Sequence, residues 1–523
     1  YPLLREKKMP KFFEPRAVDV TIWNDGQVRA SRISQNGSLV ENIVQAAINA
    51  THDVRFFPLG KNEIEDMIIE AIVFKNDYAP LTGDMIAANL IDPLKGYRVT
   101  QGDRKAIFLP EVFVIAKREN LQTLLAGLCQ KAGLEDKCYL IAQIEVFDVE
   151  DFIEDASRSD AVKLSGPVAV LSEDFSPKLL EKRLRLAADW LLSIQKPNGR
   201  FIFTVNPLSG RESQVLDWPR NALAGQALVE AYRVTGDGRY LAAAYWNAVY
   251  LRNASREMKQ RDEQFKLSLP YLNFGITQNI ALFQTTGNAA FRTEAEKYVE
   301  ILRAKLEDNG SFGGSEIADY QAFSALVQFT SIIDDRQLLM SDLFKLSEVY
   351  KGRFRSKRIL ENNSQSLAVN AWLVNGFKAL HKLTNNQDDA DFAFEVAQWL
   401  VDYQFTEGAD AKAGAFFNKP NDRYIYTRGT GKDVEAMVDA YLLAAALGQR
   451  HLAEQYYASM AKAFKWLMVM QITESNAYFV NNKNKPLAIG GLRHDLLNSE
   501  LWNDSASHFI LAAANYLRYD KEF

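Results

Sequence analysis

The chain contains little cysteine and little histidine. Its 523 residues include two cysteines, Cys129 and Cys138, and five histidines with no His-x-x-x-His pair. A closed zinc or iron–sulfur site needs three or four well-spaced ligands, so cysteine-based metal sites are excluded. A chain of this length also buries a sizeable core without a disulfide framework. We therefore expect no metal and no cofactor.

Long apolar runs and an excess of basic charge are also missing. Apolar stretches are interrupted within about a dozen residues, which is too short to span a bilayer. The formal net charge is −5 and there is no long basic block, which argues against a nucleic-acid partner. Hydrophobic residues make up 47% and charged residues 24%, the proportions of ordinary globular proteins. The composition predicts a soluble globular protein with no membrane span.

Short apolar runs separated by turns fill the first 157 residues. Asn24-Asp25-Gly26 between two such runs is a hairpin signal, because Asp-Gly accepts the positive φ angles of a tight turn. Helical patterns cover residues 39–49 and 121–132. The expected strands are residues 17–23, 27–33, 70–74, 106–115 and 139–147. The sequence predicts a mixed α+β domain over residues 1–157.

Residues 158–176 are mostly small and polar, and we expect them to be a linker. Ser176 followed by Pro177 is a helix-start signature. From residue 177 to residue 523 the periodicity is almost entirely helical, in pairs that repeat every 50–65 residues or so. Six pairs close an (α/α)6 toroid, and the second helix of each pair is richer in small and apolar residues, as an inner ring requires.

The first domain resembles the AMMECR family. The likeness rests on NDGQVR (24–29), DVRFFPL (53–59), AIFLPEV (106–112) and KAGL (131–134), which follow the family's order over almost all of residues 15–150. The resemblance implies a compact α+β domain whose family has no well-defined activity. Relatives carry Arg-Gly-Cys-Ile-Gly where this chain reads Arg29-Ala30-Ser31-Arg32-Ile33, so the natural nucleophile of that family is replaced by Ser31. We expect a degenerate binding or packing module.

The second domain resembles the six-hairpin toroids of glycoside hydrolases, polysaccharide lyases and epimerases, and is similar to terpenoid-cyclase and prenyltransferase rings. The cyclase alternative is weakened by its chemistry. Those enzymes protonate through Asp-x-Asp-Asp, whereas Asp388-Asp389-Ala390-Asp391 has another order, and a zinc-dependent ring would need a cysteine that residues 177–523 do not contain. The resemblance therefore implies a carbohydrate-active ring.

In such a ring the first residues of the inner helices surround one mouth. One carboxylic acid protonates a leaving oxygen, a second carboxylate acts as base or nucleophile, and aromatic faces stack on sugars. The candidate catalytic residues are Asp217, Asp319, Glu435 and Asp504. Aspartate at a helix start is also a preferred N-cap, which is the alternative for Asp217, Asp319 and Asp504. Glu435 lies further into its helix and is the first choice.

Candidate substrate-binding residues come from the same helix starts and from two long loops. Arginines beside helix N-termini favour an anion, so an anionic glycan is one expected substrate. These residues are Trp218, Arg220, Tyr320, Tyr424, Tyr426, Arg428, Arg493, His494 and Trp502.

Two functions follow from these patterns. The first is a glycoside hydrolase or lyase-like enzyme acting on a glycan, with the AMMECR-like domain as an accessory. The alternative is a non-catalytic glycan-binding or assembly protein that docks a protein partner through its first domain. The compartment is open: the chain does not begin with methionine, so a removed signal peptide would place it outside the cytoplasm.

Overall fold

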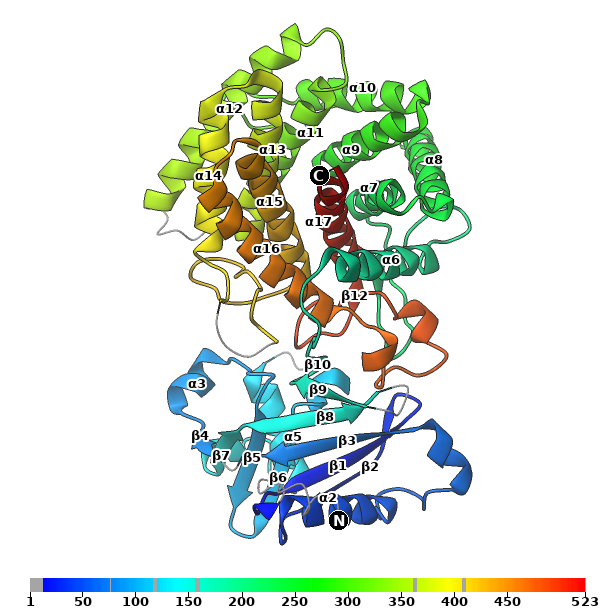
Figure 1. Ribbon diagram of the computed structural model, residues 1–523, viewed down its shortest axis with the longest axis vertical. Coiled ribbons are helices and arrows are strands. Elements are labelled where there is room, and N and C mark those ends of the chain that lie inside the picture. Colours follow the sequence, from blue (N-terminus) through cyan, green and yellow to red (C-terminus); the bar gives the residue numbers. More distant parts are fainter. Residues whose placement is uncertain are drawn as a thin grey trace.

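The computed structural model has an N-terminal domain of two sheets and a ring of helices above it (Figure 1). The structure describes residues 13–75, 77–115, 120–155, 160–262, 264, 266–360, 365–406 and 411–522.

A six-stranded antiparallel sheet forms the centre of the N-terminal domain. Its order is β10-β9-β8-β3-β1-β2. The strands are β1 (Val18–Asn24), β2 (Gln27–Ser34), β3 (Met67–Phe74), β8 (Val149–Glu154), β9 (Ala161–Ser165) and β10 (Val168–Ala169). Alternate residues of a strand face opposite sides, so Val18 and Val20 pack against helix α2 (Leu39–Thr51) while Asp19, Thr21 and Trp23 face the other way. The capping box of Ser38 and Glu41 starts α2.

A second sheet with the order β4-β7-β5-β6 completes this domain. Its strands are β4 (Ala79–Pro80), β5 (Gly96–Gln101), β6 (Arg104–Phe108) and β7 (Gln143–Phe147), and the accompanying helices are η2 (Lys61–Asp66), α3 (Gly83–Ala88), α4 (Val112–Ile115), α5 (Leu121–Lys131) and η3 (Cys138–Leu140). The expected strand over 106–115 is two elements, because Pro110 has no N–H to donate to a ladder. A buried disulfide between Cys129 and Cys138 joins α5 to η3.

The expected linker is partly sheet. Strands β9 and β10 both lie within residues 158–176 and extend the six-stranded sheet beyond β8. Between β10 and the first ring helix, residues 170–176 form neither strand nor helix. The sequence missed these strands because they are short, with five residues in β9 and two in β10.

Helices α6 to α17 alternate between an outer and an inner layer. The outer helices are α6 (Pro177–Ser193), α8 (Gly238–Arg261), α10 (Ala289–Arg303), α12 (Gln337–Leu360), α14 (Gln387–Val401) and α16 (Arg450–Met470). The inner helices are α7 (Trp218–Thr235), α9 (Leu269–Thr286), α11 (Glu316–Thr330), α13 (Leu367–Thr384), α15 (Thr427–Ala446) and α17 (Asn503–Glu522). Each inner helix contacts the next and α17 contacts α7, so the ring is a closed (α/α)6 toroid. None of the described helices has the length and apolar composition that crossing a membrane requires.

A glutamine at the end of three outer helices ties each repeat to its neighbour. The amide Nε2 of Gln195 donates to the carbonyl of Ala243 in α8, at 2.9 Å. Gln404 donates in the same way to Ser459 in α16, and Gln471 to Arg183 in α6. The last of these bonds joins the final repeat to the first.

Each glutamine also holds a nearby glycine in the left-handed region. Gly199, Gly414 and Gly490 have φ of 92°, 99° and 95°. A Cβ on Gly414 would lie 2.1 Å from the carbonyl oxygen of Lys462, so glycine is required for this close approach. In the last repeat the glycine of this turn is Gly490, 19 residues after Gln471, and the segment between them contacts the N-terminal domain through Tyr478 and Asn481.

Helix α15 begins earlier than the sequence indicates. The sequence predicts its start near Asp433, but the helix starts at Thr427 and contains Gly429 and Gly431. A Cβ at Gly431 would lie 3.0 Å from His508 Cβ, so tight packing against α17 overrides the low helix propensity of glycine. Glu435 therefore lies two turns inside the ring, about 12 Å beyond the helix start at 1.5 Å per residue, and not at its mouth.

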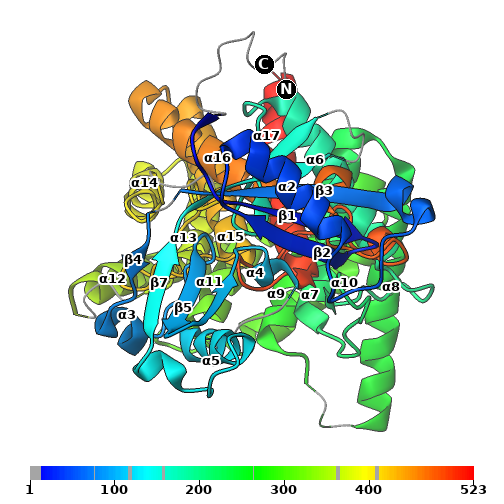
Figure 2. The same cartoon turned by 90° about the horizontal axis from the view of Figure 1, so that it is seen from below.

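The two domains share one apolar core. Trp23, Val114, Ile153, Leu164 and Val168 of the first domain belong to the same cluster of buried residues as the ring helices. The ring of Trp23 meets Tyr478 edge-on with their centroids 5.0 Å apart. Seen from below, the sheet lies across the end of the ring, with α2 in front of it, on the side away from the ring (Figure 2).

Buried carboxyl groups accompany this interface. Glu70 and Asp151 are 0% and 1% exposed, and Trp23 Nε1 donates to Glu70 Oε2 at 2.8 Å. Burial raises the pKa of Glu70, and Asp151 raises it further. Burial and then Glu111 raise the pKa of Asp151 in the same way.

This arrangement predicts a pH-dependent stability. An acid whose pKa rises on folding contributes stability below its ordinary pKa near 4 and loses that contribution as the pH rises toward the raised value. Asp151→Asn should therefore be more stable than the parent at about pH 8, with a difference that grows by up to about 1.4 kcal/mol per pH unit and vanishes near pH 4. Urea unfolding over this range measures it. Asp103→Asn, an exposed control between β5 and β6, should show no such trend; a parent-like slope for Asp151→Asn contradicts the prediction.

Candidate functional site

The starts of α7, α15 and α17 meet around a buried carboxylate. Asp504 Oδ2 lies 3.3 Å from Arg220 Nε and 3.7 Å from Arg428 Nη1. The Asp504 side chain is 2% exposed, whereas both arginines are about one-third exposed. Asp217 caps α7 by accepting from Arg220 N at 3.0 Å and pairs with the Arg220 guanidinium at 3.1 Å. We call Asp217, Arg220, Arg428 and Asp504 the mouth cluster. Its two positive and two negative charges balance.

Aromatic side chains lie beside the mouth cluster. His494 stacks on Trp502 with their centroids 4.1 Å apart, and Arg428 lies 5.5 Å from the Trp502 ring. Tyr424 and Tyr426 stack on each other at 5.5 Å, and Tyr426 is 6.0 Å from His494. Burial lowers the pKa of His494, which favours the neutral imidazole. The structure thus brings together six of the residues expected at the mouth with Asp217 and Asp504.

Other expected site residues lie elsewhere. Asp319 accepts from Phe312 N at 2.9 Å and pairs with Arg353 at 3.1 Å, so its carboxylate holds the preceding turn to an outer helix. Tyr320 is 0% exposed and donates to Glu316, which leaves no ring face for stacking. Arg493 is 2% exposed and donates to the carbonyl of Pro167 at the domain interface. Burial lowers its pKa to about 10.

Trp218 follows Asp217 at the start of α7. Its ring meets Tyr271 of α9 edge-on at 5.4 Å, and the residue is partly exposed. Trp218 is therefore placed on the inner rim but packs against a neighbouring helix.

Charged residues line the inner face of the ring behind the mouth. On α15 they recur at Arg428, Lys432, Glu435 and Asp439, a spacing of four, three and four residues that keeps one helix face. On α17 the matching face carries Asp504, His508, Asn515 and Arg518. Side chains from all six inner helices line an axial cavity of about 320 Å³.

Glu435 is the central carboxylate of this cavity. Its Oε1 lies 2.5 Å from His508 Nδ1 and its Oε2 lies 3.0 Å from Lys432 Nζ. Burial raises its pKa, but Lys432 and His508 outweigh burial, and the pKa of Glu435 falls below its ordinary value. Lys432 also stands 3.4 Å from the centre of the Trp372 ring and donates to Asn375. Glu435 is therefore an ionised carboxylate and a poor proton donor.

Asp439, one turn further along α15, has three donors. Asn375 Nδ2 donates to it at 2.6 Å and Asn515 Nδ2 at 2.8 Å, and Lys378 Nζ donates to the same carboxylate. Lys378 therefore balances the negative charge of Asp439, the second carboxylate of the cavity. Glu435 and Asp439 thus share a cavity without forming the free acid and base of a two-carboxylate hydrolase.

Amide and hydroxyl groups form another part of the cavity wall. They come from five inner helices, and each can both donate and accept a hydrogen bond. These side chains are Gln226, Thr277, Ser324, Gln328, Asn375 and Asn515. A second pocket of about 500 Å³ adjoins the cavity at the C-terminal ends of α13, α15 and α17, and shares Lys378, Lys382, Asn515 and Arg518 with it.

The Ser31 position of the first domain has no histidine partner in the described structure. Ser31 Oγ donates to Asp19 at 3.0 Å, and Arg55 holds Asp53 beside it. His52 Nδ1 instead contacts Thr51 and the carbonyl of Ile48. Burial raises the pKa of Asp19, which favours the neutral carboxyl over the carboxylate that could accept the Ser31 proton. Ser31 therefore lacks the activation that a nucleophile needs.

No group of three or more His, Cys, Asp or Glu side chains in the described ranges is arranged to hold a metal ion.

These features define a two-domain protein that joins an α+β domain to an (α/α)6 toroid. Residues 2–152 match the AMMECR1 family, and the N-terminal domain is an AMMECR1 domain. A protein of Methanosarcina acetivorans is 26% identical over 162 residues, which cover 29% of this chain and 79% of that protein.

The ring is similar to solved six-hairpin toroids. An unsaturated glucuronyl hydrolase specific for heparin matches 66% of this chain and 99% of its own, with a TM-score of 0.50 and 14% identity. An α-1,6-mannanase from Salegentibacter sp. matches 65% of this chain and 99% of its own, with a TM-score of 0.49 and 12% identity. At such low identity the likeness is one of fold.

No sequence motif points to His508. Its partner Glu435 is 73 residues away, and no local motif connects them. The helical spacing from Asp504 to His508 was a usable signal, because residues four apart share a helix face.

The mouth cluster predicts unequal effects for its two aspartates. Asp217→Asn should cost little stability, because asparagine caps a helix as well as aspartate does. Asp504→Asn removes the shared partner of two arginines and should cost more, about 1–3 kcal/mol, since those arginines are partly solvated. Urea unfolding of both variants measures the difference. Equal losses would show that Asp504 is no more than a helix-end residue.

Proposed function

We propose that the ring is a carbohydrate-active enzyme that moves a proton on a small saccharide held in the axial cavity. The observation that carries this proposal is the hydrogen bond of 2.5 Å between His508 Nδ1 and the ionised Glu435. When His508 is neutral and its Nδ1 proton is donated to Glu435, its Nε2 is an acceptor. The carboxylate then stabilises the imidazolium that forms when His508 takes a proton.

The cavity wall supports a saccharide as substrate. Side chains that both donate and accept suit the hydroxyl groups of a sugar, and Gln226, Ser324 and Asn515 present such groups from three helices. A volume of about 320 Å³ lies at the low end of ligand pockets, which favours one or two sugar rings over a polymer chain. The toroid fold is also that of an unsaturated glucuronyl hydrolase.

The charges favour proton abstraction over hydrolysis. Hydrolysis needs a carboxylic acid that is kept protonated. Glu435 is held ionised, and Asp439 is paired with Lys378 and accepts hydrogen bonds from two amides. A base at His508 with Lys432 nearby suits removal of a proton beside a carbonyl or carboxylate, as in epimerisation or β-elimination. Lys432 would stabilise the negative charge that develops on oxygen. An anionic glycan remains within this substrate class.

A non-catalytic glycan-binding or assembly role is the second candidate. It is favoured by the three hydrogen-bond donors that surround Asp439, because a network in which every charge is paired also serves to fix the inner helices.

The experiment is proton exchange in D₂O. The purified protein is incubated with neutral reducing sugars and uronates, and loss of each sugar C–H signal is followed by NMR. Glu435→Gln keeps a hydrogen-bonding group but removes the charge, so exchange should slow by about 10²–10⁴-fold. His508→Gln should slow it comparably. Asp319→Asn, on the far side of an inner helix, is the control and should exchange like the parent.

Two outcomes oppose this assignment. If sugars bind to the parent and to both variants but no C–H exchange or new product forms, the binding role replaces the catalytic one. If exchange persists unchanged in Glu435→Gln, the Glu435–His508 pair is not the base.

A further inference from the structure

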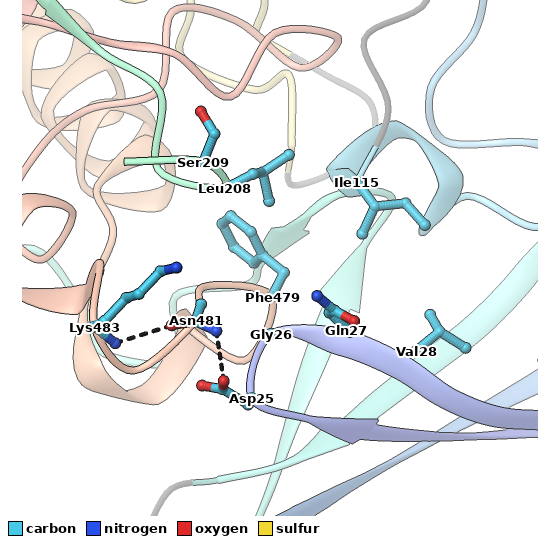
Figure 3. Close-up of a pocket in the computed structure, with 10 residues that line it drawn as sticks. All are labelled: Asp25, Gly26, Gln27, Val28, Ile115, Leu208, Ser209, Phe479, Asn481 and Lys483. Carbon is cyan, nitrogen blue, oxygen red and sulfur yellow. Dashed lines mark hydrogen bonds between the residues drawn. The ribbon is translucent and has the colours of Figure 1, made fainter. Parts of the chain in front are cut away.

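The turn between β1 and β2 presses against a ring loop. Asp25 accepts hydrogen bonds from Asn481 Nδ2 and, at 2.7 Å, from Asn482 N. Gly26 has φ of 77°, and a Cβ there would lie 2.4 Å from Asn481 N. Figure 3 shows the turn directly against the loop, beside a pocket of about 460 Å³. A residue with any side chain at position 26 would displace one of the two segments.

The same loop leads to the mouth of the ring. It connects α16 to α17 and passes through residues 471–502, which we call the mouth loop. Beyond Asn481 it carries His494, which stacks on Trp502, and the carbonyl of His494 accepts from Thr427 N at 2.9 Å. The position of the mouth loop therefore determines where the His494–Trp502 stack lies at the mouth of the ring.

The N-terminal domain holds the mouth loop at further points. Arg493 donates to the carbonyl of Pro167, and Leu497 packs against the apolar cluster of the second sheet that includes Tyr97 and Leu125. These contacts lie directly beside His494, on both sides of it in sequence.

The ring also secures the mouth loop, at residues 487–490 and, through Thr427, at the carbonyls of Arg493 and His494. Trp190 Nε1 donates to the carbonyl of Leu487, and Gln471 Nε2 donates to that of Gly490. These bonds fix residues 487–490. The segments around Asn481 and Leu497 are the ones that also contact the N-terminal domain.

We propose that the AMMECR1 domain is a positioning element for the ring: its β1–β2 turn and its Leu497 contact set the mouth loop and thereby the His494–Trp502 stack. The domain then acts on the ring through loop geometry and contributes no reacting group. This inference is independent of the proposed reaction, because its measurements follow the loop and not turnover.

Two glycines provide a matched test. Gly26 and Gly102 both occupy hairpin turns of the N-terminal domain at positive φ, 77° and 59°. Alanine at either position costs similar backbone strain, but nothing lies within 4 Å of a Cβ at Gly102. A difference between Gly26→Ala and Gly102→Ala therefore reports the contact with the mouth loop.

Hydrogen exchange of the full chain is the first readout. In Gly26→Ala, amides of residues 478–502 should exchange at least about tenfold faster than in Gly102→Ala, while those in the middle of α15 and α17 stay as in the parent. Equal exchange of the mouth loop in the two variants would overturn the proposal.

The titration of His494 is the second readout, one that a loss of general stability would not move. Burial lowers its pKa, with Asp495 opposing and Arg428 adding to that effect. A loosened loop exposes the imidazole of His494 to water. The pKa of His494 measured by NMR should therefore rise toward its ordinary value in Gly26→Ala and stay as in the parent in Gly102→Ala.

Asp25→Ala covers the case in which Gly26→Ala does not fold. It removes the hydrogen bonds to Asn481 and Asn482 without adding volume. Faster exchange confined to the mouth loop supports the proposal, and parent-like exchange with a parent-like His494 titration refutes it. Unchanged sugar exchange alongside a loosened loop would leave the positioning role in place and separate it from the proposed reaction.

Discussion

Closure of the ring is the constraint on which the other features depend. The amide of Gln471 bonds to the carbonyl of Arg183, which joins the last repeat to the first, and β11 (Thr204–Val205) pairs with β12 (Leu501–Trp502) across the same seam. Closure turns the inner faces of six helices toward one another. Polar side chains on those faces leave bulk water and must find partners inside. The ion pairs along α15 and α17 are the consequence.

Two kinds of buried carboxyl group show what those partners decide. Glu435 has Lys432 and His508 against it, and its pKa lies below the ordinary value despite burial. Glu70 and Asp151 are equally enclosed but face other carboxyl groups, and their pKa values rise. The presence of a cation therefore decides whether burial yields an ionised base or a neutral acid. In the ring, this difference makes Glu435 a partner for His508 and not a proton donor.

The sequence was most informative where structure is local. Helical periodicity predicted the six helix pairs, and Asn24-Asp25-Gly26 predicted the first hairpin. It failed where distant packing decides. Glycine has a low helix propensity, yet α15 runs through Gly429 and Gly431, and at Gly431 the close approach of α17 leaves little room for a side chain. His508 found its partner 73 residues away, and the burial of Tyr320 depends on neighbouring helices that no local pattern encodes.

The AMMECR1 domain contacts the loops that lead to the mouth of the ring. In a bare toroid, the loops before α15 and α17 would be free to contact substrate at the mouth. Here Lys412 of the first loop pairs with Asp92 at 3.2 Å, and the second loop is gripped at Asn481 and Leu497. These loops are therefore committed in part to docking, and the mouth cluster balances its own charges. The axial cavity and the adjoining pocket continue to the C-terminal ends of the inner helices and are lined there by amide groups and lysines. A ligand that approaches from that end meets Lys382 and Asn515 before it reaches Glu435, because both residues line the adjoining pocket as well as the cavity.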